Sequence, residues 1–385
     1  MPAWFNHGPF TMFRLVASLL LLAAARLQAA PVPLPPAIAA SGHLLMDYHS
    51  GAVLAEANAD RRLEPASLTK IMTAYVVFRE LEAGKLSLND QVVVSKKAWK
   101  TPGSRMFIEV GKRVSVDDLI HGMIVASGND ACVALAEHIA GSEEAFAALM
   151  NEHALRLGMD QTHFTNATGL PDPDHYTTPA DILKVTRALI AEFPQFYPIY
   201  SQRQFTYNGI TQKNRNKLLW RDPSVDGVKT GHTQAAGYCL VASAKREGMR
   251  LLSVVMGTKS EEARAQETQK LLNYGFRFYQ THRLFPAGKA LREVRIWKGD
   301  RERLGLGLER DLYVTIPRGE YTNLKARTRL KHGIMAPIHE GEELGRLIVE
   351  LDGEVLQDVP LVALEEVREG GLVHNLIDSL LMIFE

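Results

Sequence analysis

The 385-residue sequence predicts an α+β protein, in which an antiparallel sheet covered by helices is followed by a small all-β domain and a C-terminal amphipathic helix. Apolar hairpin patterns occur early and late in the first 284 residues, with helical periodicity between them. After Phe285 the pattern changes to short alternating runs broken by Gly, Pro and Asp, which is typical of a small β domain. The 44 basic and 44 acidic residues balance, so the composition does not suggest nucleic acid as a partner.

The N-terminus has the pattern of an export signal. Arg14 precedes the apolar run "LVASLLLLAAA", which has signal-peptide length and is too short to span a bilayer. Small residues follow, and we expect cleavage after Ala29, so that residues 1–29 form the signal peptide. An uncleaved N-terminal anchor and a start at Met12 are the alternatives. In each case the body of the protein is exported.

The order of elements follows from periodicity and from turn residues. A hairpin is predicted at residues 42–60, with its turn at Ser50-Gly51. A second hairpin is predicted at residues 237–257, turning at residues 246–248. The predicted helices are 67–81, 115–140, 142–157, 178–193 and 261–280, with a loop at 165–178.

The two cysteines and the histidines do not suggest a metal site. Export would permit a disulfide, but Cys132 and Cys239 each lie inside an apolar segment. We therefore expect both to be free, buried side chains. No cluster of Cys and His has the spacing of metal ligands, and we expect neither a metal nor another cofactor.

Three short motifs carry the chemistry. Ser67 and Lys70 form S-x-x-K at the start of a predicted helix, where their spacing places both on one face. Alone, this motif is more often a helix start with a solvated lysine. The S-G-N motif, residues 127–129, lies between two apolar runs and is either a helix-joining turn or a pair of side chains aimed into a cleft. The K-T-G motif, residues 229–231, lies just before or on a strand. In this order the three are the established signature of β-lactamases and penicillin-binding proteins.

With the stretches "SGNDACVALAEHIAG", "NRNKLLW", "VDGVKTGHT" and "LLNYGFRFY", the sequence resembles the D-alanyl-D-alanine carboxypeptidases of the penicillin-binding protein 5 and 6 group. The resemblance covers nearly the whole chain. It implies a β-lactamase/DD-peptidase-like catalytic domain at 30–284, an all-β domain at 285–367 and a membrane-anchor helix at 368–385. It also implies peptidoglycan stem peptides ending in D-Ala-D-Ala as substrates, β-lactams as covalent inhibitors, and a place on the periplasmic face of the cytoplasmic membrane.

The chemistry of acyl transfer explains the residue types. A serine hydroxyl needs a base, and Lys70 can serve as one only when neutral. Burial and the charge of Lys229 would lower its pKa, while hydrogen bonds to Ser127 and Asn129 would orient it. Ser127 could then pass a proton to the departing D-alanine.

The resemblance also implies the groups that bind the substrate. The oxyanion needs two donors, for which it implies the backbone N–H groups of Ser67 and His232. A terminal carboxylate needs a cation and hydroxyls, and Lys229 and Thr230 fit. Arg264 and Arg215 are the charged candidates from matching stretches. The alternative is that each is an ordinary solvated arginine. The expected substrate-binding residues are Asn129, Lys229, Thr230, Gly231, His232, Arg264 and Arg215.

Other functions fit the motifs less well. A class A β-lactamase would carry a deacylating glutamate after its second motif, but no Glu occurs between Glu152 and Glu192. A DD-endopeptidase on cross-linked peptides uses the same chemistry and is the closest alternative. A non-catalytic peptidoglycan-binding protein would not need the intact serines and lysines of the motifs.

The C-terminal segment from Gly371 is amphipathic. Its large apolar residues fall in one half of a helical wheel, which fits either a helix docked on the β domain or an interfacial membrane helix. Family anchors of this kind tend to be basic. This segment instead carries Asp378 and Glu385, with no Lys or Arg after Arg368.

Overall fold

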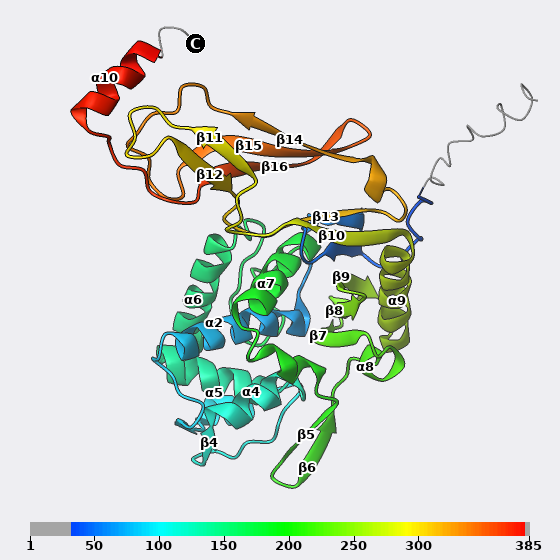
Figure 1. Ribbon diagram of the computed structural model, residues 1–385. Helices are drawn as coiled ribbons and strands as arrows, with labels where there is room; N and C mark the ends of the chain where they lie inside the picture. The colour runs from blue at the N-terminus through cyan, green and yellow to red at the C-terminus, as the bar shows by residue number, and fades with distance from the viewer. Residues whose placement is uncertain (1–31, 382–385) are drawn as a thin grey trace, which may run out of the picture.

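The computed structural model describes residues 32–381, so the predicted signal peptide lies outside the described residues. Figure 1 shows a larger helix-covered domain and, above it, an elongated β domain that carries the last helix at its outer end. The two predicted halves of the chain are therefore present as two bodies, as expected for an α+β protein with a separate β module.

A five-stranded antiparallel sheet forms the centre of the larger domain. Its strands, in spatial order, are β2 (Val53–Ala57), β1 (Gly42–Asp47), β9 (Met249–Thr258), β8 (Gly237–Arg246) and β7 (Val225–Thr233). The β1–β2 and β8–β9 pairs are the two predicted hairpins. Because β1 pairs with β9, the start of the domain is joined directly to its end, and the helices form between them.

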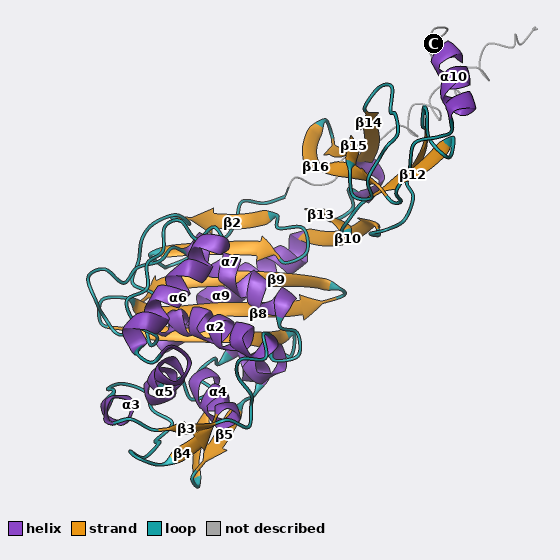
Figure 2. Ribbon diagram, turned by 90° about the vertical axis from the view of Figure 1, so that its left-hand side faces the viewer, coloured by secondary structure: helices purple, strands orange, loops and turns teal. Residues whose placement is uncertain are grey.

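Helices cover both faces of this sheet (Figure 2). On one face α9 packs on β8 and β9, and on the other α7 packs on β1 and β9. Behind α7 lies α2, which α4, α5 and α6 surround. The helices are α2 (Lys70–Glu82), α3 (Lys96–Lys100), α4 (Val116–Ile124), α5 (Asn129–Ala140), α6 (Glu143–Arg156), α7 (Pro179–Glu192), α8 (Leu218–Arg221) and α9 (Glu261–Phe278). Two small hairpins complete the domain, β3 (Gln91–Val93) with β4 (Arg113–Ser115) and β5 (Gln204–Tyr207) with β6 (Ile210–Lys213).

Local sequence signals set most helix ends. The hydroxyls of Ser142, Thr178 and Ser260 each accept a backbone N–H from three residues ahead, which is the usual N-cap arrangement. Gly141 ends α5 in the left-handed conformation, as its predicted role as a stop requires. These ends agree with the predicted helices to within a few residues.

Two predicted helices are divided. The helix predicted at 67–81 begins as a 3-10 turn, η1 (Ala66–Thr69), and becomes α-helical only at Lys70. The continuous helix predicted at 115–140 is wrong, because α4 ends at Ile124 and α5 begins at Asn129. Between them Ser127 has φ 60°, a conformation that no α-helix contains. The S-G-N motif thus joins two helices, with Asn129 as the first residue of α5. Its Ser127 and Asn129 side chains also accept hydrogen bonds from Lys229 and Lys70, so both predicted alternatives hold.

The β domain is built on a second five-stranded sheet. Its order is β11 (Arg292–Arg295), β12 (Arg303–Gly307), β16 (Glu354–Ala363), β15 (Glu343–Leu351) and β14 (Leu324–Leu330). A separate pair, β10 (Tyr279–Phe285) with β13 (Leu312–Pro317), lies between this sheet and the larger domain. The domain has its own apolar core, so it can hold its shape without the larger domain's core.

A buried polar network joins the two domains. The Asp47 carboxylate, at the end of β1, accepts hydrogen bonds from the Ser50 N–H at 2.7 Å and from the Thr281 hydroxyl of β10 at 2.7 Å. The Ser50 and Thr315 hydroxyls lie 2.6 Å apart, which adds β13 to the network. Asp47 is fully buried, so these bonds replace its contacts with water.

The last helix, α10 (Leu372–Leu381), meets the β domain through its polar side. Asp378 is buried and accepts a hydrogen bond of 2.5 Å from the Lys298 N–H. Leu372, Leu376 and Leu380 are exposed by 91%, 68% and 57%. Residues 32–381 contain no helix that is both long and apolar enough to cross a membrane.

Candidate active site

The S-x-x-K motif brings a serine and a lysine into direct contact. Ser67 lies in η1, and Lys70 is the first residue of α2. The Lys70 Nζ donates to the Ser67 Oγ over 2.9 Å. Ala66, which precedes the serine, has φ 47°, a strained conformation of the kind that gathers at functional sites.

Two further oxygens fix the Lys70 amine. It donates to the Asn129 Oδ1 and to the Thr168 carbonyl oxygen, each at 2.7 Å. The Asn129 amide nitrogen in turn donates to the Pro102 carbonyl oxygen at 2.7 Å, so its orientation is set from both ends. Lys70 is only 1% exposed, and the amine therefore points at the serine from a dry, fixed position.

The turn between α4 and α5 brings in the second serine. The Lys229 Nζ donates to the Ser127 Oγ over 2.8 Å. The sequence predicted that Ser127 and Asn129 would both bind Lys70. In the structure Asn129 does so, and the Ser127 hydroxyl is bonded instead to Lys229. The three motifs therefore form two hydrogen-bonded pairs, Ser67 with Lys70 and Ser127 with Lys229. The bond from Lys70 to Asn129 joins the first motif to the second.

Strand β7 carries the third motif along the edge of the sheet. Lys229 and Thr230 are buried, while His232 is exposed with its ring stacked on Tyr238, 3.9 Å between centroids. A Cβ added to Gly231 would lie 3.0 Å from the Pro65 carbonyl oxygen and 3.3 Å from the Ser67 nitrogen. Glycine thus lets the strand lie close against the turn that holds Ser67.

Burial changes the protonation of both lysines. It lowers the pKa of Lys70 to about 8, because the charged ammonium loses its contact with water. Burial also holds the pKa of Lys229 well below its ordinary value, and the adjacent charge of Lys70 lowers it further. A neutral amine next to the serine is therefore accessible near neutral pH. The arrangement can remove a proton from a hydroxyl nucleophile, as acyl transfer requires.

Comparison with known proteins decides the family. Residues 28–260 match a family described as D-alanyl-D-alanine carboxypeptidase, and residues 279–369 match the penicillin-binding protein 5 C-terminal domain. The chain belongs to the D-alanyl-D-alanine carboxypeptidase family. This carboxypeptidase is 44% identical over 361 residues to D-alanyl-D-alanine carboxypeptidase DacA of Escherichia coli (strain K12), with 92% of this chain and 90% of the relative covered. It is 45% identical to DacC of the same organism, over 91% of this chain and 89% of the relative.

Solved structures agree with this assignment. Penicillin binding protein 5 from Haemophilus influenzae superimposes with a TM-score of 0.84 at 43% identity, over 88% of this chain and all of that one. Penicillin binding protein 6B from Escherichia coli gives a TM-score of 0.72 at 38% identity, over 86% and 97%. The predicted family, fold class and class of enzyme, a D-Ala-D-Ala carboxypeptidase, are confirmed.

The two candidate arginines of the carboxypeptidase differ in their surroundings. Arg264 is buried beside β7, where its Nη1 donates to the Gly231 carbonyl oxygen at 3.2 Å. Its Nη2 is buried, makes no hydrogen bond among the described residues and lies 3.9 Å from the Glu261 carboxylate. Arg215 is exposed and donates to the Ser104 hydroxyl at 2.6 Å. The interpretation as a solvated arginine therefore does not hold for Arg264.

Several supporting groups were missed from the sequence. Asp130 is buried and accepts the backbone N–H groups of Met106 and Phe107, each at 2.9 Å, which fixes the loop facing Asn129. Its position in the first turn of α5 was a usable signal, because acids favour helix N-termini. The Thr168 carbonyl gave no signal, because any residue type supplies one.

The loop at 165–178 offers Lys70 a carbonyl oxygen from Thr168, not a carboxylate. His175 in this loop contacts the Thr69 hydroxyl through Nε2 at 2.8 Å, and its Nδ1 accepts the Thr165 N–H at 3.0 Å. Burial lowers the pKa of His175 to about 4, so it is neutral and holds the loop on η1. Cys132 and Cys239 are free and buried, as predicted. Among residues 32–381, His, Cys, Asp and Glu form no group that could hold a metal ion.

Proposed function

We propose that Ser67 is the nucleophile of this carboxypeptidase and that neutral Lys70 is its base. The observation that carries the proposal is the 2.9 Å contact between the Lys70 Nζ and the Ser67 Oγ. In acylation, Ser67 attacks the carbonyl carbon between the two D-alanines of a stem peptide, and its proton passes to Lys70. The C–N bond then breaks, and the amine of the departing D-alanine takes a proton through Ser127.

The remaining groups of the site would bind the oxyanion and the terminal carboxylate of the substrate. The oxyanion would accept hydrogen bonds from the backbone N–H groups of Ser67 and His232, which the closeness of β7 to η1 supports. The terminal carboxylate would be bound by Thr230, Lys229 and Arg264, whose guanidinium lies beside Gly231. A carboxylate beside Lys229 raises the pKa of that lysine, so substrate binding leaves Lys70 as the neutral member of the pair.

We propose that Lys70 also serves deacylation. Water must attack the ester on Ser67, and the described part of the 165–178 loop gives this lysine a carbonyl oxygen and no carboxylate. The same acyl-enzyme chemistry accounts for covalent binding of penicillin, in which the opened β-lactam stays attached to the serine.

Replacement of the nucleophile tests this function. Ser67→Ala removes the one hydroxyl among residues 32–381 to which the Lys70 Nζ donates. We expect loss of both D-alanine release from a pentapeptide and labelling by fluorescent penicillin. Ser201→Ala, at an exposed serine of η2 (Tyr197–Ser201), is the control and should keep both. Normal D-alanine release by the Ser67 variant would overturn the assignment.

We also propose that residues 1–29 are removed on export and that α10 holds the protein on the periplasmic face of the cytoplasmic membrane. The polar side of α10 contacts the β domain through Asp378, and Leu372, Leu376, Ile377 and Leu380 are exposed. Burial of that face in the interfacial region would stabilise attachment. Asp378 thus docks α10 on the β domain while the exposed apolar residues stay available to the membrane.

Truncation after Gly370 followed by fractionation tests the attachment. We expect the shortened protein in the soluble fraction, and we expect high salt to leave most of the intact protein on the membrane because the α10 contact is hydrophobic. If truncation leaves the membrane fraction unchanged, α10 is a docked structural element and does not anchor the protein.

A further inference from the structure

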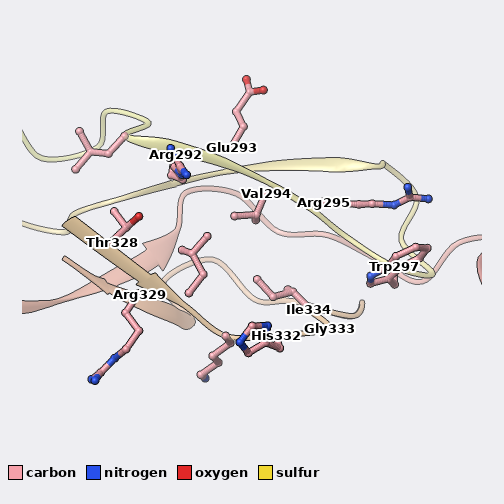
Figure 3. Close-up of a pocket in the computed structure, with 13 residues that line it drawn as sticks. Arg292, Glu293, Val294, Arg295, Trp297, Thr328, Arg329, His332, Gly333 and Ile334 are labelled. Carbon is pink, nitrogen blue, oxygen red and sulfur yellow. The ribbon is translucent and has the colours of Figure 1, made fainter. Parts of the chain in front are cut away.

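A groove in the β domain lies between the two edge strands of its sheet. Strands β11 and β14 are the edges, and the chain closes one end of the space between them through a 2.9 Å hydrogen bond from the Trp297 N–H to the Ile334 carbonyl oxygen. The groove has a volume of about 780 Å³. Figure 3 shows Val294 and Ile334 pointing into it from opposite sides, so its floor is apolar.

The rim of this groove is basic. It is lined by Arg292, Arg295, Arg329, Lys331 and His332. Glu293 and Arg329 belong to the same lining, but both side chains point away from the space between the strands (Figure 3), so Arg329 adds its charge beside the groove and not within it. Arg292, Arg329 and Lys331 are exposed, and no carboxylate of a described residue lies within ion-pair distance of them. In a chain of zero net charge this is a local surplus of positive charge, which attracts anions.

The groove adjoins the last helix. The Arg295 guanidinium lies over the Trp297 ring at 3.9 Å, and its Nη2 is 3.8 Å from the Asp378 carboxylate of α10. One residue of the basic rim therefore also contacts the helix. Since Asp378 is docked, the exposed apolar face of α10 is fixed near the groove.

We propose that this groove binds the headgroups of anionic phospholipids in the membrane that α10 enters. The inference rests on the proposed attachment through α10. A single apolar contact gives only reversible binding, and stable peripheral attachment takes a second component. Helix α10 has no Lys or Arg of its own, and the groove beside it supplies the missing charge. An acidic extended peptide could also pair with the strand edges, but it would not explain why the basic rim is joined to an exposed apolar helix.

Binding to vesicles tests this inference with the exported protein. Sedimentation would compare neutral phosphatidylcholine vesicles with vesicles that also contain phosphatidylglycerol. The groove variant is Arg292→Gln, Arg329→Gln and Lys331→Gln. The matched control is Lys96→Gln, Lys100→Gln and Lys112→Gln, three exposed lysines of the larger domain with no ion pair to a described residue. They lie in α3 and just before β4, which Figure 2 shows at the end remote from the β domain. Penicillin labelling of both variants checks that the protein is folded.

We expect the wild type and the lysine control to bind anionic vesicles more tightly than neutral ones. Each basic residue near a membrane contributes about fivefold, so the groove variant should lose up to about a hundredfold on anionic vesicles. Its binding to neutral vesicles, which reports α10 alone, should not change.

Equal loss in the lysine control would overturn the proposal, as would unchanged binding by the groove variant. Loss of membrane association in cells without loss on pure lipid would also overturn it, in favour of an acidic protein partner. Failure of all forms to bind any vesicle would instead count against α10 as an anchor, and the proposal for the groove would fall with it.

Discussion

At the scale of single residues, the chemistry depends on the protonation of one buried amine. Lys70 has three oxygen acceptors around its Nζ and no carboxylate among them. A carboxylate partner would keep the lysine charged and useless as a base, whereas burial favours the neutral form. The surroundings of Lys70 therefore favour a neutral amine that can act as a base over a charged amine with a structural role.

The rate of acylation by penicillin should depend on pH through Lys70. Its pKa of about 8 lies below the ordinary lysine value, and the neutral form is the active one. Activity should therefore rise as pH increases through about 8 and fall toward acid, where the amine is protonated. Stopped-flow acylation across this range measures the profile. A rate that stays flat down to mildly acidic pH would rule out a neutral lysine base.

Replacement of Lys70 by Arg should nearly abolish acylation although it keeps the positive charge. Arginine does not deprotonate in proteins, so the variant has no base for Ser67. General bases contribute roughly 10² to 10⁴ in rate, and a loss of that order is expected in penicillin acylation. If the variant acylates at the wild-type rate, Lys70 is only an electrostatic neighbour.

Arg264 should act on substrate binding more than on chemistry. Its Nη1 donates to the Gly231 carbonyl oxygen, beside the place proposed for the peptide carboxylate. Arg264→Gln should therefore raise KM for a pentapeptide by about tenfold or more, the range for a lost hydrogen bond to a charged group, with a smaller change in kcat. The steady-state kinetics of D-alanine release measure both. A fall in kcat at unchanged KM would contradict this role.

At the scale of elements, the site depends on how closely β7 approaches η1. Gly231→Ala would place a methyl group 3.0 Å from the Pro65 carbonyl oxygen, so β7 or the turn that holds Ser67 must shift by a few tenths of an ångström. We expect slower acylation and a loss of about 1–3 kcal/mol in the free energy of unfolding. Gly371→Ala is a suitable control, since its Cβ would meet nothing within 4 Å. If Gly231→Ala unfolds at the same temperature as this control and is labelled by penicillin at the same rate, the added methyl group is accommodated and the prediction is wrong.

The elements also show what the sequence could predict. The hairpins and most helix ends follow from alternation and capping residues, which act locally. The break at residues 125–128 was missed because apolar periodicity continues across it, while tertiary contacts hold Ser127 at φ 60°. The motifs identified Ser67, Lys70, Ser127 and Lys229 as one site. Which hydroxyl each lysine binds depends on side-chain packing, and so does the contact from Lys70 to Thr168, 98 residues away.

At the scale of the whole molecule, Asp47 couples the two domains. Its buried carboxylate is bonded to Ser50 and to Thr281 across the joint. Asp47→Ala would leave the Ser50 N–H without its acceptor, whereas the Thr281 hydroxyl keeps its contact with the Thr315 hydroxyl at 2.9 Å. We expect a loss of about 1–3 kcal/mol in the free energy of unfolding for the buried group that stays unsatisfied. Calorimetry should show the β domain unfolding apart from the larger one. Asp47→Asn keeps an acceptor oxygen and should be milder. Identical unfolding of the Ala variant and the wild type would mean that the joint is held by other contacts.

The most direct test of the account is the site of covalent attachment by penicillin. The intact mass of the exported protein after brief exposure should increase by one molecule of antibiotic. Peptide mapping should place the adduct on Ser67, whose hydroxyl is the one that Lys70 contacts. An adduct on Ser127 would reverse the roles of the two serines, and a folded protein that gains no mass would contradict acyl-enzyme catalysis at this site.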